Sequence, residues 1–322
     1  MHAKPRHRVR KAVKTKAVAA TPDVSRTKPP FERPAGVKYR IAVLGTGWAS
    51  MTFLSRLEPR EDVEVVLVSP RNYFLYTPLL PSAATGAVES RAIVEPVRSK
   101  LSGKGFQFYN AECVDLDTED KVISCVAAGV TQPYRFRMKY DYLVVGVGAV
   151  PNTFNVPGVE ENCLFLKEML DANNLRRTVN RRFERAALPG TSEKRIREVL
   201  TFVIVGGGPS GVELAAELDD LIQKDIAKTF PPALARCASV QIVELQDHIL
   251  STYDRRLAEY ATQRFQRNGI KTILNSRVVQ VNRGSIIVAD KITNEEREVP
   301  FGICVWCTGT ALLFGRCAFL GN

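Results

Sequence analysis

The sequence predicts an α/β protein built from two Rossmann-like domains, and three observations carry this prediction. The first is a strand, a glycine turn and a helix in immediate succession within residues 200–218. The second is a less complete succession of the same kind near residue 45, and the third is an equal distance from each turn to a later apolar strand. A chain of 322 residues has room for two such domains, each with its own core.

The stretch 200–218 matches the pattern of a dinucleotide-binding turn. Thr201–Val205 is an apolar, β-branched run, which is typical of a buried parallel strand. Gly206, Gly208 and Gly211 follow at G-x-G-x-x-G spacing. In this pattern the glycines allow a tight turn, close approach of a pyrophosphate, and close helix–strand packing. We therefore expect a dinucleotide phosphate at the positive end of the following helix.

A second glycine turn strengthens this interpretation, because a single fingerprint is weak evidence. Gly45 and Gly47 follow the apolar strand Ile41–Leu44, although Ser50 replaces the third glycine. The turn is followed by a predicted crossover helix, Trp48–Leu57, and by a second strand over residues 63–68. The chain therefore carries a second, less complete nucleotide-binding turn.

The two turns belong to equivalent units of the sequence. Gly45 to Gly148 and Gly206 to Gly309 both span 103 residues (148 − 45 and 309 − 206). Both later glycines end an apolar strand, predicted over residues 142–147 in the first unit and over residues 301–308 in the second. Two nucleotide-binding units in one chain imply two bound nucleotides.

The residue that ends the second strand differs between the units. Ser69 ends it in the first unit, 24 residues after Gly45 (69 − 45), where an acidic ribose ligand is expected at about 20. A hydroxyl can bind a ribose hydroxyl there, more weakly than a carboxylate. In the second unit Glu244 follows strand Val240–Val243, and a longer helix and the Pro231-Pro232 loop account for its distance from the turn.

Three further expectations concern connecting and accessory elements. Gln107–Asp115 and Lys121–Val126 read as paired strands joined by a turn. Glu161–Ala187 reads as a polar helical connector between the units. A later helix, ending at a glycine C-cap near residue 269, is expected to bury one apolar face. That face consists of Leu257, Tyr260, Ala261 and Phe265.

The net charge of +11 is concentrated at the N-terminus. Residues 1–30 hold nine Lys/Arg and one acid, Asp23, so that 9 − 1 = +8 of the charge lies there. A basic, acid-poor N-terminus favours an organellar targeting segment, with a nucleic-acid-binding arm or a solvated tail as alternatives. Residues 21–34 hold four prolines and read as a linker.

Composition argues against several other classes of protein. No apolar run approaches the roughly 18–20 residues of a membrane-spanning helix, so we expect any membrane contact to be peripheral. Of three histidines, only His248 lies outside the tail, and the turn at Gly208 does not match the G-x-S-x-G elbow of serine hydrolases. We therefore expect neither a metal site nor serine hydrolysis.

The pair Cys304 and Cys307 matches the C-x-x-C redox pattern, but both cysteines lie in a run that reads as a buried strand. Residues three apart in a strand point to opposite faces, so their sulfurs cannot bridge. We expect two core cysteines that stay free thiols under oxidising conditions.

Over residues 39–311 the chain resembles the type II NADH dehydrogenases, the single-subunit, non-proton-pumping NADH:quinone oxidoreductases of mitochondria. The segments that carry the resemblance are GTGWAS, SPRNYFLYTPLLPS, IVEPVR, DYLVVGVGAVPNTFNVPG, FLKEMLDANNLRR, VIVGGGPSGVELAAEL and DHIL. The resemblance implies an FAD/NAD(P)-binding fold of the pyridine nucleotide-disulfide oxidoreductase type.

The resemblance also implies site residues and cofactors. For FAD they are Gly45, Gly47, Trp48, Ser69, Arg71, Thr77, Gly146 and Gly148. For NADH they are Gly206, Gly208, Gly211, Glu244 and Gly309. Glu213 is the implied catalytic residue near the contact of nicotinamide and flavin, but Ser210-x-x-Glu213 is equally a helix capping box.

The implied reaction is hydride transfer from NADH to FAD, followed by transfer of two electrons to a membrane quinone. The implied location is the mitochondrial inner membrane, as a peripheral protein, with a homodimer left open and no nucleic acid as partner. The alternatives are a soluble-acceptor FAD-dependent reductase and an inactive nucleotide-binding fragment.

The resemblance stops near Leu312, and we expect a C-terminally truncated member of the family. The predicted divisions are a tail and linker (1–36), an incomplete FAD-binding domain (37–158), an NADH-binding domain with its connector (159–311) and a divergent end (312–322). Such a chain is expected to keep NADH binding and to lose stable FAD binding and quinone reduction.

Overall fold

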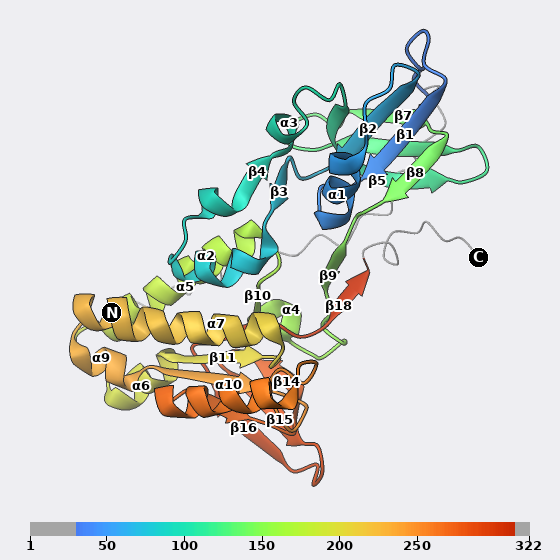
Figure 1. The fold of residues 1–322 in the computed structure, drawn as a ribbon. Helices are drawn as coiled ribbons and strands as arrows, with labels where there is room; N and C mark the ends of the chain where they lie inside the picture. The colour runs from blue at the N-terminus through green and yellow to red at the C-terminus, as the bar shows by residue number, and fades with distance from the viewer. Residues whose placement is uncertain (1–29, 313–322) are drawn as a thin grey trace, which may run out of the picture.

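A computed structural model describes residues 30–312, which form two lobes joined by crossing segments (Figure 1). The predicted basic tail and most of the divergent end lie outside the described residues. Within residues 30–312, no helix combines the length and the apolar character needed to cross a bilayer.

The upper lobe in Figure 1 is built on a six-stranded sheet in the order β7-β6-β5-β2-β1-β8. Strands β5, β2, β1 and β8 pair in parallel, and β5, β6 and β7 continue as an antiparallel meander, as predicted for the paired strands. The bounds are β1 Tyr39–Leu44, α1 Trp48–Arg56, β2 Val63–Ser69, α3 Val97–Lys100, β5 Gln107–Asp117, β6 Val122–Ala127, β7 Arg135–Lys139 and β8 Tyr142–Val145.

The lower lobe is built on a five-stranded sheet, all parallel, in the order β10-β17-β11-β12-β13, with a separate antiparallel sheet β14-β15-β16. Its strands are β10 Leu164–Phe165, β11 Thr201–Val205, β12 Ser239–Val243, β13 Lys271–Ile273, β14 Ser276–Asn282, β15 Ser285–Asp290, β16 Glu296–Pro300 and β17 Ile303–Trp306. Its helices are α4 Val159–Asn162, α5 Met169–Ala186, α6 Glu193–Val199, α7 Pro209–Asp220, a π-helix Leu221–Ile226, α8 Ala227–Thr229, α9 Pro232–Cys237 and α10 Arg255–Asn268.

The repeat of two equivalent units is confirmed by register and backbone conformation. Leu44 pairs with Val145 across β1 and β8, and Val205 pairs with Trp306 across β11 and β17. The first turn glycines, at 45 and 206, have φ of +93° and +111°, and the later glycines, at 148 and 309, have +79° and +74°. These four positions lie in the region that favours glycine, which explains why the repeat is readable from glycines.

A segment from the first unit packs on the second lobe. It contains β3 Tyr73–Leu75, the 3₁₀ helix Thr77–Leu79, α2 Leu80–Thr85, the 3₁₀ helix Ser90–Ile93 and β4 Val94–Pro96. Leu75, Leu80, Ala83 and Ala84 are buried in one core with residues of α5 and α7. The proposed boundary near residue 158 thus divides the chain by sequence order, while this part of the first unit contributes to the core of the second.

A pair of strands, β9 and β18, crosses between the lobes in addition to the segment that contains β3 and β4. β9 Ala149–Pro151 pairs antiparallel with β18 Thr310–Leu312. Gly148 precedes β9 and Gly309 precedes β18, and the amide of Asn152 donates to the Gly309 carbonyl at 3.2 Å. Gly148 and Gly309, which follow the two equivalent strands, therefore stand at the starts of the two crossing strands.

The prediction of a polar helical connector over Glu161–Ala187 is only partly correct, because the segment is not helical throughout and α5 is not polar on all faces. The segment contains the end of α4, strand β10 and α5 instead. Six residues of α5 are buried, including Leu175 and Phe183, because every third or fourth position is apolar or small and faces the core. The many arginines between these positions made the helix look fully polar.

The predicted apolar face of α10 is only partly correct. The helix ends at Asn268, and Gly269 adopts the left-handed C-cap conformation as predicted. Phe265 is buried, but Leu257 and Tyr260 are 47% and 61% exposed, and Ala258 is the other buried residue. The helix contacts its sheet along a narrow stripe, so its first turns leave large apolar side chains at the surface.

Cys304 and Cys307 lie against different cores, as predicted, although only Cys304 lies in β17 and Cys307 follows the end of that strand. Cys304 is buried with the residues of β14–β16, and Cys307 packs against the core that contains α5 and α7. The thiol closest to Cys304 is that of Cys163, with 3.4 Å between the sulfurs. The cysteines of residues 30–312 are free thiols.

Candidate functional site

The turn before α7 has the form of a phosphate cradle. Gly208 is the N-cap of α7, and no side chain caps the helix. A Cβ built on Gly208 would meet nothing within 4 Å, so the space beside the helix N-terminus is open. A Cβ on Gly211 would lie 2.0 Å from the carbonyl oxygen of Gly206, so only glycine fits there. Uncapped amides with open space in front of them suit an anionic phosphate.

Glu244 lies beside this turn, at the end of β12. Its Oε2 accepts from the backbone amide of Gly207 at 2.5 Å, and its Oε1 accepts from the amide of Gln246 at 2.8 Å. The carboxylate is therefore held next to the cradle, where a ribose ligand is expected.

The turn before α1 repeats the cradle with different packing. Gly47 is the N-cap of α1, again without a side-chain cap. A Cβ on Gly45 would lie 2.3 Å from the carbonyl oxygen of Gly146. Ser50 takes the place of the third glycine, and its hydroxyl donates to the Leu44 carbonyl at 3.1 Å. A Cβ on Gly146 would lie 2.1 Å from that hydroxyl, so Ser50 fills the space that Gly146 leaves.

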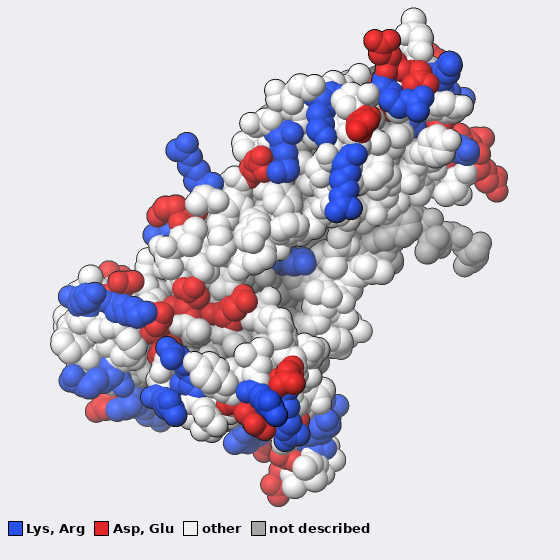
Figure 2. Space-filling view, in the orientation of Figure 1, with Lys and Arg blue, Asp and Glu red and all other residues white. Residues whose placement is uncertain are grey.

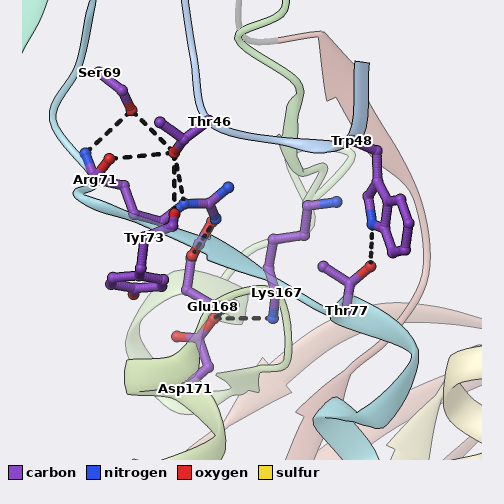
Figure 3. Close-up of polar contacts among 9 residues, drawn as sticks. All are labelled: Thr46, Trp48, Ser69, Arg71, Tyr73, Thr77, Lys167, Glu168 and Asp171. Carbon is purple, nitrogen blue, oxygen red and sulfur yellow. Dashed lines mark hydrogen bonds and ion pairs between the residues drawn. The ribbon is translucent and has the colours of Figure 1, made fainter. Parts of the chain in front are cut away.

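Ser69 is held in a network beneath the first turn (Figure 3). Its Oγ accepts from the backbone amide of Arg71 at 3.2 Å and lies 3.3 Å from the hydroxyl of Thr46. Ser69 is only 3% exposed. The structure thus shows Ser69 bracing the loop that carries Arg71, and its expected contact with a ribose stays a prediction.

Arg71 reaches from the upper lobe to the start of α5 (Figure 3). Its Nη1 donates to both carboxylate oxygens of Glu168, at 2.8 and 3.0 Å. Glu168 is the N-cap of α5 and forms a capping box with Asp171. Glu168 was not predicted as a site residue, although the spacing Glu-x-x-Asp before a helical pattern resembles a capping box.

Trp48 and Thr77 lie on the opposite side of Figure 3 from Arg71 and Glu168. The indole N–H of Trp48 donates to the hydroxyl of Thr77 at 3.1 Å, and the indole contacts the rings of Phe74 and Tyr76. Trp48 is 47% exposed, so a large aromatic surface borders the first turn. Both residues were predicted as part of the FAD site, and the structure brings them together.

Helix α7 meets the segment from the first unit through Glu217. Ser82 and Thr85 of α2 donate to its carboxylate at 2.7 and 3.3 Å. Glu213 lies one turn earlier on α7, and burial, with the nearby charge of Glu217, raises the pKa of its carboxyl. The capping-box reading of Ser210 and Glu213 is wrong, because α7 has Gly208 as its N-cap and no side-chain cap.

The predicted site residues therefore gather in three places. Gly45, Gly47, Trp48, Ser69, Arg71, Thr77 and Gly146 lie around the first turn, Gly206, Gly208, Gly211 and Glu244 lie around the second, and Gly148 and Gly309 open the crossing segments. Glu213 lies on the helix that follows the second turn. Figure 2 shows a hollow between the lobes, with acidic side chains gathered over α7 at its lower edge. Among the described residues, no group of His, Cys, Asp and Glu is arranged to hold a metal ion.

Two Rossmann-like units in tandem, with glycine cradles at two helix N-termini, define the class of the tandem dinucleotide-binding oxidoreductases. Comparison with known proteins gives the family. The profile of the family "Pyridine nucleotide-disulphide oxidoreductase" matches residues 39–312. The chain belongs to this family, and the predicted fold class is confirmed.

Several named relatives are similar to the chain. It is 46% identical over 283 residues to the external alternative NAD(P)H-ubiquinone oxidoreductase B1, mitochondrial, of Solanum tuberosum, covering 86% of this chain and 48% of that protein. It is 38% identical over 284 residues to the external alternative NADH-ubiquinone oxidoreductase, mitochondrial, of Yarrowia lipolytica, covering 85% and 48%. The chain thus spans about half the length of these curated relatives.

A solved structure agrees with these similarities. NDH2 of Plasmodium falciparum, solved in complex with NADH, superposes with a TM-score of 0.81 at 31% identity, covering 86% of this chain and 56% of that one. Sulfide:quinone oxidoreductase of Aquifex aeolicus gives a TM-score of 0.65 at 18% identity, a likeness of fold alone.

Proposed function

We propose that the chain binds FAD at the first glycine turn and NADH at the second, and that it belongs to a flavoprotein that passes electrons from NADH to a quinone without pumping protons. The names of the relatives support the quinone as acceptor and the mitochondrion as location. The proposal includes peripheral association with the inner membrane.

The observation that carries the proposal is a continuous path of contacts between the two cradles. Trp48, next to the first cradle, bonds to Thr77, which begins the segment leading into α2. Ser82 on α2 bonds to Glu217 on α7, whose N-terminus is the second cradle. Two nucleotides bound at these turns would extend toward the same region between the lobes. This arrangement suits direct transfer between two cofactors.

FAD would supply the redox chemistry, accepting a hydride from the nicotinamide and passing two electrons on. The chain's own residues would bind and orient the two nucleotides. Gly47 and Gly208 leave space for the pyrophosphates, and Glu244 selects the nicotinamide nucleotide through its ribose. Glu213 is an exposed residue of α7, one turn before Glu217, and partial desolvation together with the charge of Glu217 raises the pKa of its carboxyl. We propose that it contacts the reacting rings.

The experiment is to titrate the purified chain separately with FAD and NADH and to assay NADH oxidation with a quinone and with a soluble acceptor. Flavin binding together with quinone-dependent oxidation supports the proposal. Flavin binding with oxidation only by a soluble acceptor favours a soluble-acceptor reductase. NADH binding without flavin binding at any concentration tested would overturn the proposed FAD site. It would agree with the expectation from the sequence that this chain lacks stable FAD binding, and it would reduce the function to that of a nucleotide-binding fragment.

A further inference from the structure

The backbone of Lys167 is fixed at the junction of β10 and α5. The amides of Lys167 and Glu168 both donate to Oδ2 of Asp171, at 2.9 and 2.8 Å. The same Asp171 completes the capping box of α5. A side chain that leaves this junction therefore starts from a well-defined position.

The side chain of Lys167 points toward the first glycine turn. In Figure 3 it extends toward the loop from Thr46 to Trp48, and its ammonium lies between the Arg71 guanidinium and the Trp48 indole. Lys167 is half-buried, and its Nζ makes no hydrogen bond or ion pair with another residue of the described range 30–312. A half-buried ammonium without a protein partner suits contact with an anion.

The local charges distinguish Lys167 from Arg71. The Arg71 guanidinium donates to both oxygens of Glu168, so this pair contributes no net charge. Lys167 carries its positive charge toward the first turn, whereas the carboxylate of Asp171 is held at the backbone amides of Lys167 and Glu168. The Arg71 guanidinium lies beside the turn, since a Cβ on Gly47 would lie 3.9 Å from Nη2 of Arg71.

We propose that Lys167 is the main side-chain cation that binds the pyrophosphate of FAD at the Gly45–Gly47 turn, and that the Arg71–Glu168 pair acts chiefly to position the chain around it. The inference rests on the proposed FAD site and adds a residue to it. The pyrophosphate is negatively charged, and the N-terminus of α1 supplies backbone amides but only a partial charge. An ammonium on a flexible stem can complete the neutralisation as a point charge.

The test compares FAD affinities of the full chain by quenching of flavin fluorescence. Lys167→Gln should weaken FAD binding about 10-fold to 100-fold, the value of one charge-assisted contact. Lys167→Arg should restore most of the affinity. The double variant Arg71→Gln with Glu168→Gln removes both charges of the pair and should weaken FAD binding less than Lys167→Gln does, because the pair positions the chain and carries no net charge. Lys194→Gln, at an exposed lysine of α6, is the matched control and should bind like wild type.

Two further readouts separate the possible failures. NADH affinity, measured on the same samples, should stay unchanged in every variant if the fold is intact. The dependence of FAD affinity on salt should become shallower in Lys167→Gln, because one charge contact is gone. Equal FAD affinities of wild type and Lys167→Gln, or a larger loss in the double variant, would overturn the inference while leaving the FAD site in place. Absence of FAD binding by the wild type would overturn the proposed function and the inference with it.

Discussion

The equivalent strands β8 and β17 have the same place in their units but different surroundings. β17 lies between β10 and β11, and all four of its residues are buried. Within residues 30–312, β8 pairs with β1 alone, and Tyr142 and Val145 are 59% and 42% exposed. Residues of α5 cover one face of β17, and the β14–β16 sheet covers the other. Two units of one design thus differ in how completely they are enclosed.

This difference predicts the largest measurable effect. The backbone amides of β8 should exchange hydrogen about a hundredfold or more faster than those of β17, because an open edge needs little or no opening free energy. Exchange followed by mass spectrometry on peptides spanning Tyr142–Val145 and Ile303–Trp306 checks this. Strand β11, which is paired on both sides, is the internal reference. Equal protection of β8 and β17 would mean that β8 is covered in solution.

The ends of the second strands give a second comparison. Glu244 places a carboxylate beside the second cradle, whereas Ser69 places a buried hydroxyl beside the first. A carboxylate binds a ribose 2′-OH and repels a 2′-phosphate, so NADH should bind on the order of 100-fold more tightly than NADPH. Titration of the chain with both nucleotides measures the ratio.

The variant Glu244→Gln sharpens this test. The side-chain amide of Gln keeps an oxygen that can accept from the Gly207 amide but carries no charge. The ratio of the affinities for NADH and NADPH should therefore become smaller. Glu259→Gln, on an exposed turn of α10, is a control for loss of one carboxylate. Equal affinity of the wild type for NADH and NADPH would exclude Glu244 as the ribose ligand.

The third position of each turn should respond differently to a methyl group. In the second unit Gly211→Ala would place a Cβ against the Gly206 carbonyl, and it should lower the free energy of unfolding by about 1–3 kcal/mol and weaken NADH binding. In the first unit Ser50→Ala removes only a hydroxyl that bonds to Leu44, at a cost of about 1 kcal/mol. Denaturant unfolding of both variants measures the two effects. If Ser50→Ala lowered the free energy of unfolding more than Gly211→Ala, the conclusion that the third position of the second turn is the more tightly packed would be wrong.

Features that depend on local backbone chemistry could be predicted from the sequence. The repeat could be recognised from the glycines at 45, 148, 206 and 309, because each adopts a positive φ that favours glycine whatever the rest of the fold does. The connector could not be predicted, since α5 is buried by partners from both units while its exposed face is rich in arginine. The same holds for α10, where the sheet covers only part of the apolar face.

For the site, the sequence placed the cradles but missed the residues that connect them. Glu168 and Lys167 are ordinary charged residues before a helix, and only the fold brings them to Arg71 and the first turn. Glu217 is likewise unremarkable in the sequence until α2 supplies Ser82 and Thr85. Contacts between the lobes depend on relative placement, which local patterns do not encode.

Glu213 and Glu217 lie one turn apart on α7 but have different surroundings. This difference gives the smallest of the expected effects, a dependence of stability on pH. Glu217 has hydroxyl donors, whereas burial and the charge of Glu217 raise the pKa of Glu213. A carboxyl with a higher pKa in the folded chain binds its proton more tightly when folded. Its ionisation therefore reduces stability as pH rises from about 4.3, the ordinary value for Glu, through the folded pKa.

Glu213→Gln mimics the protonated form and should remove this dependence. The variant should unfold at a higher temperature than wild type near pH 8, and the difference should shrink as the pH is lowered toward about 4. Thermal unfolding across this range measures it, with Glu184→Gln on the exposed face of α5 as control. If the unfolding temperatures of wild type and Glu213→Gln differed by the same amount at every pH, the difference would come from packing and not from ionisation of Glu213. If Glu213 contacts the reacting rings as proposed, saturating NADH should change the difference in unfolding temperature between wild type and Glu213→Gln. Glu184→Gln should stay indistinguishable from wild type with and without NADH.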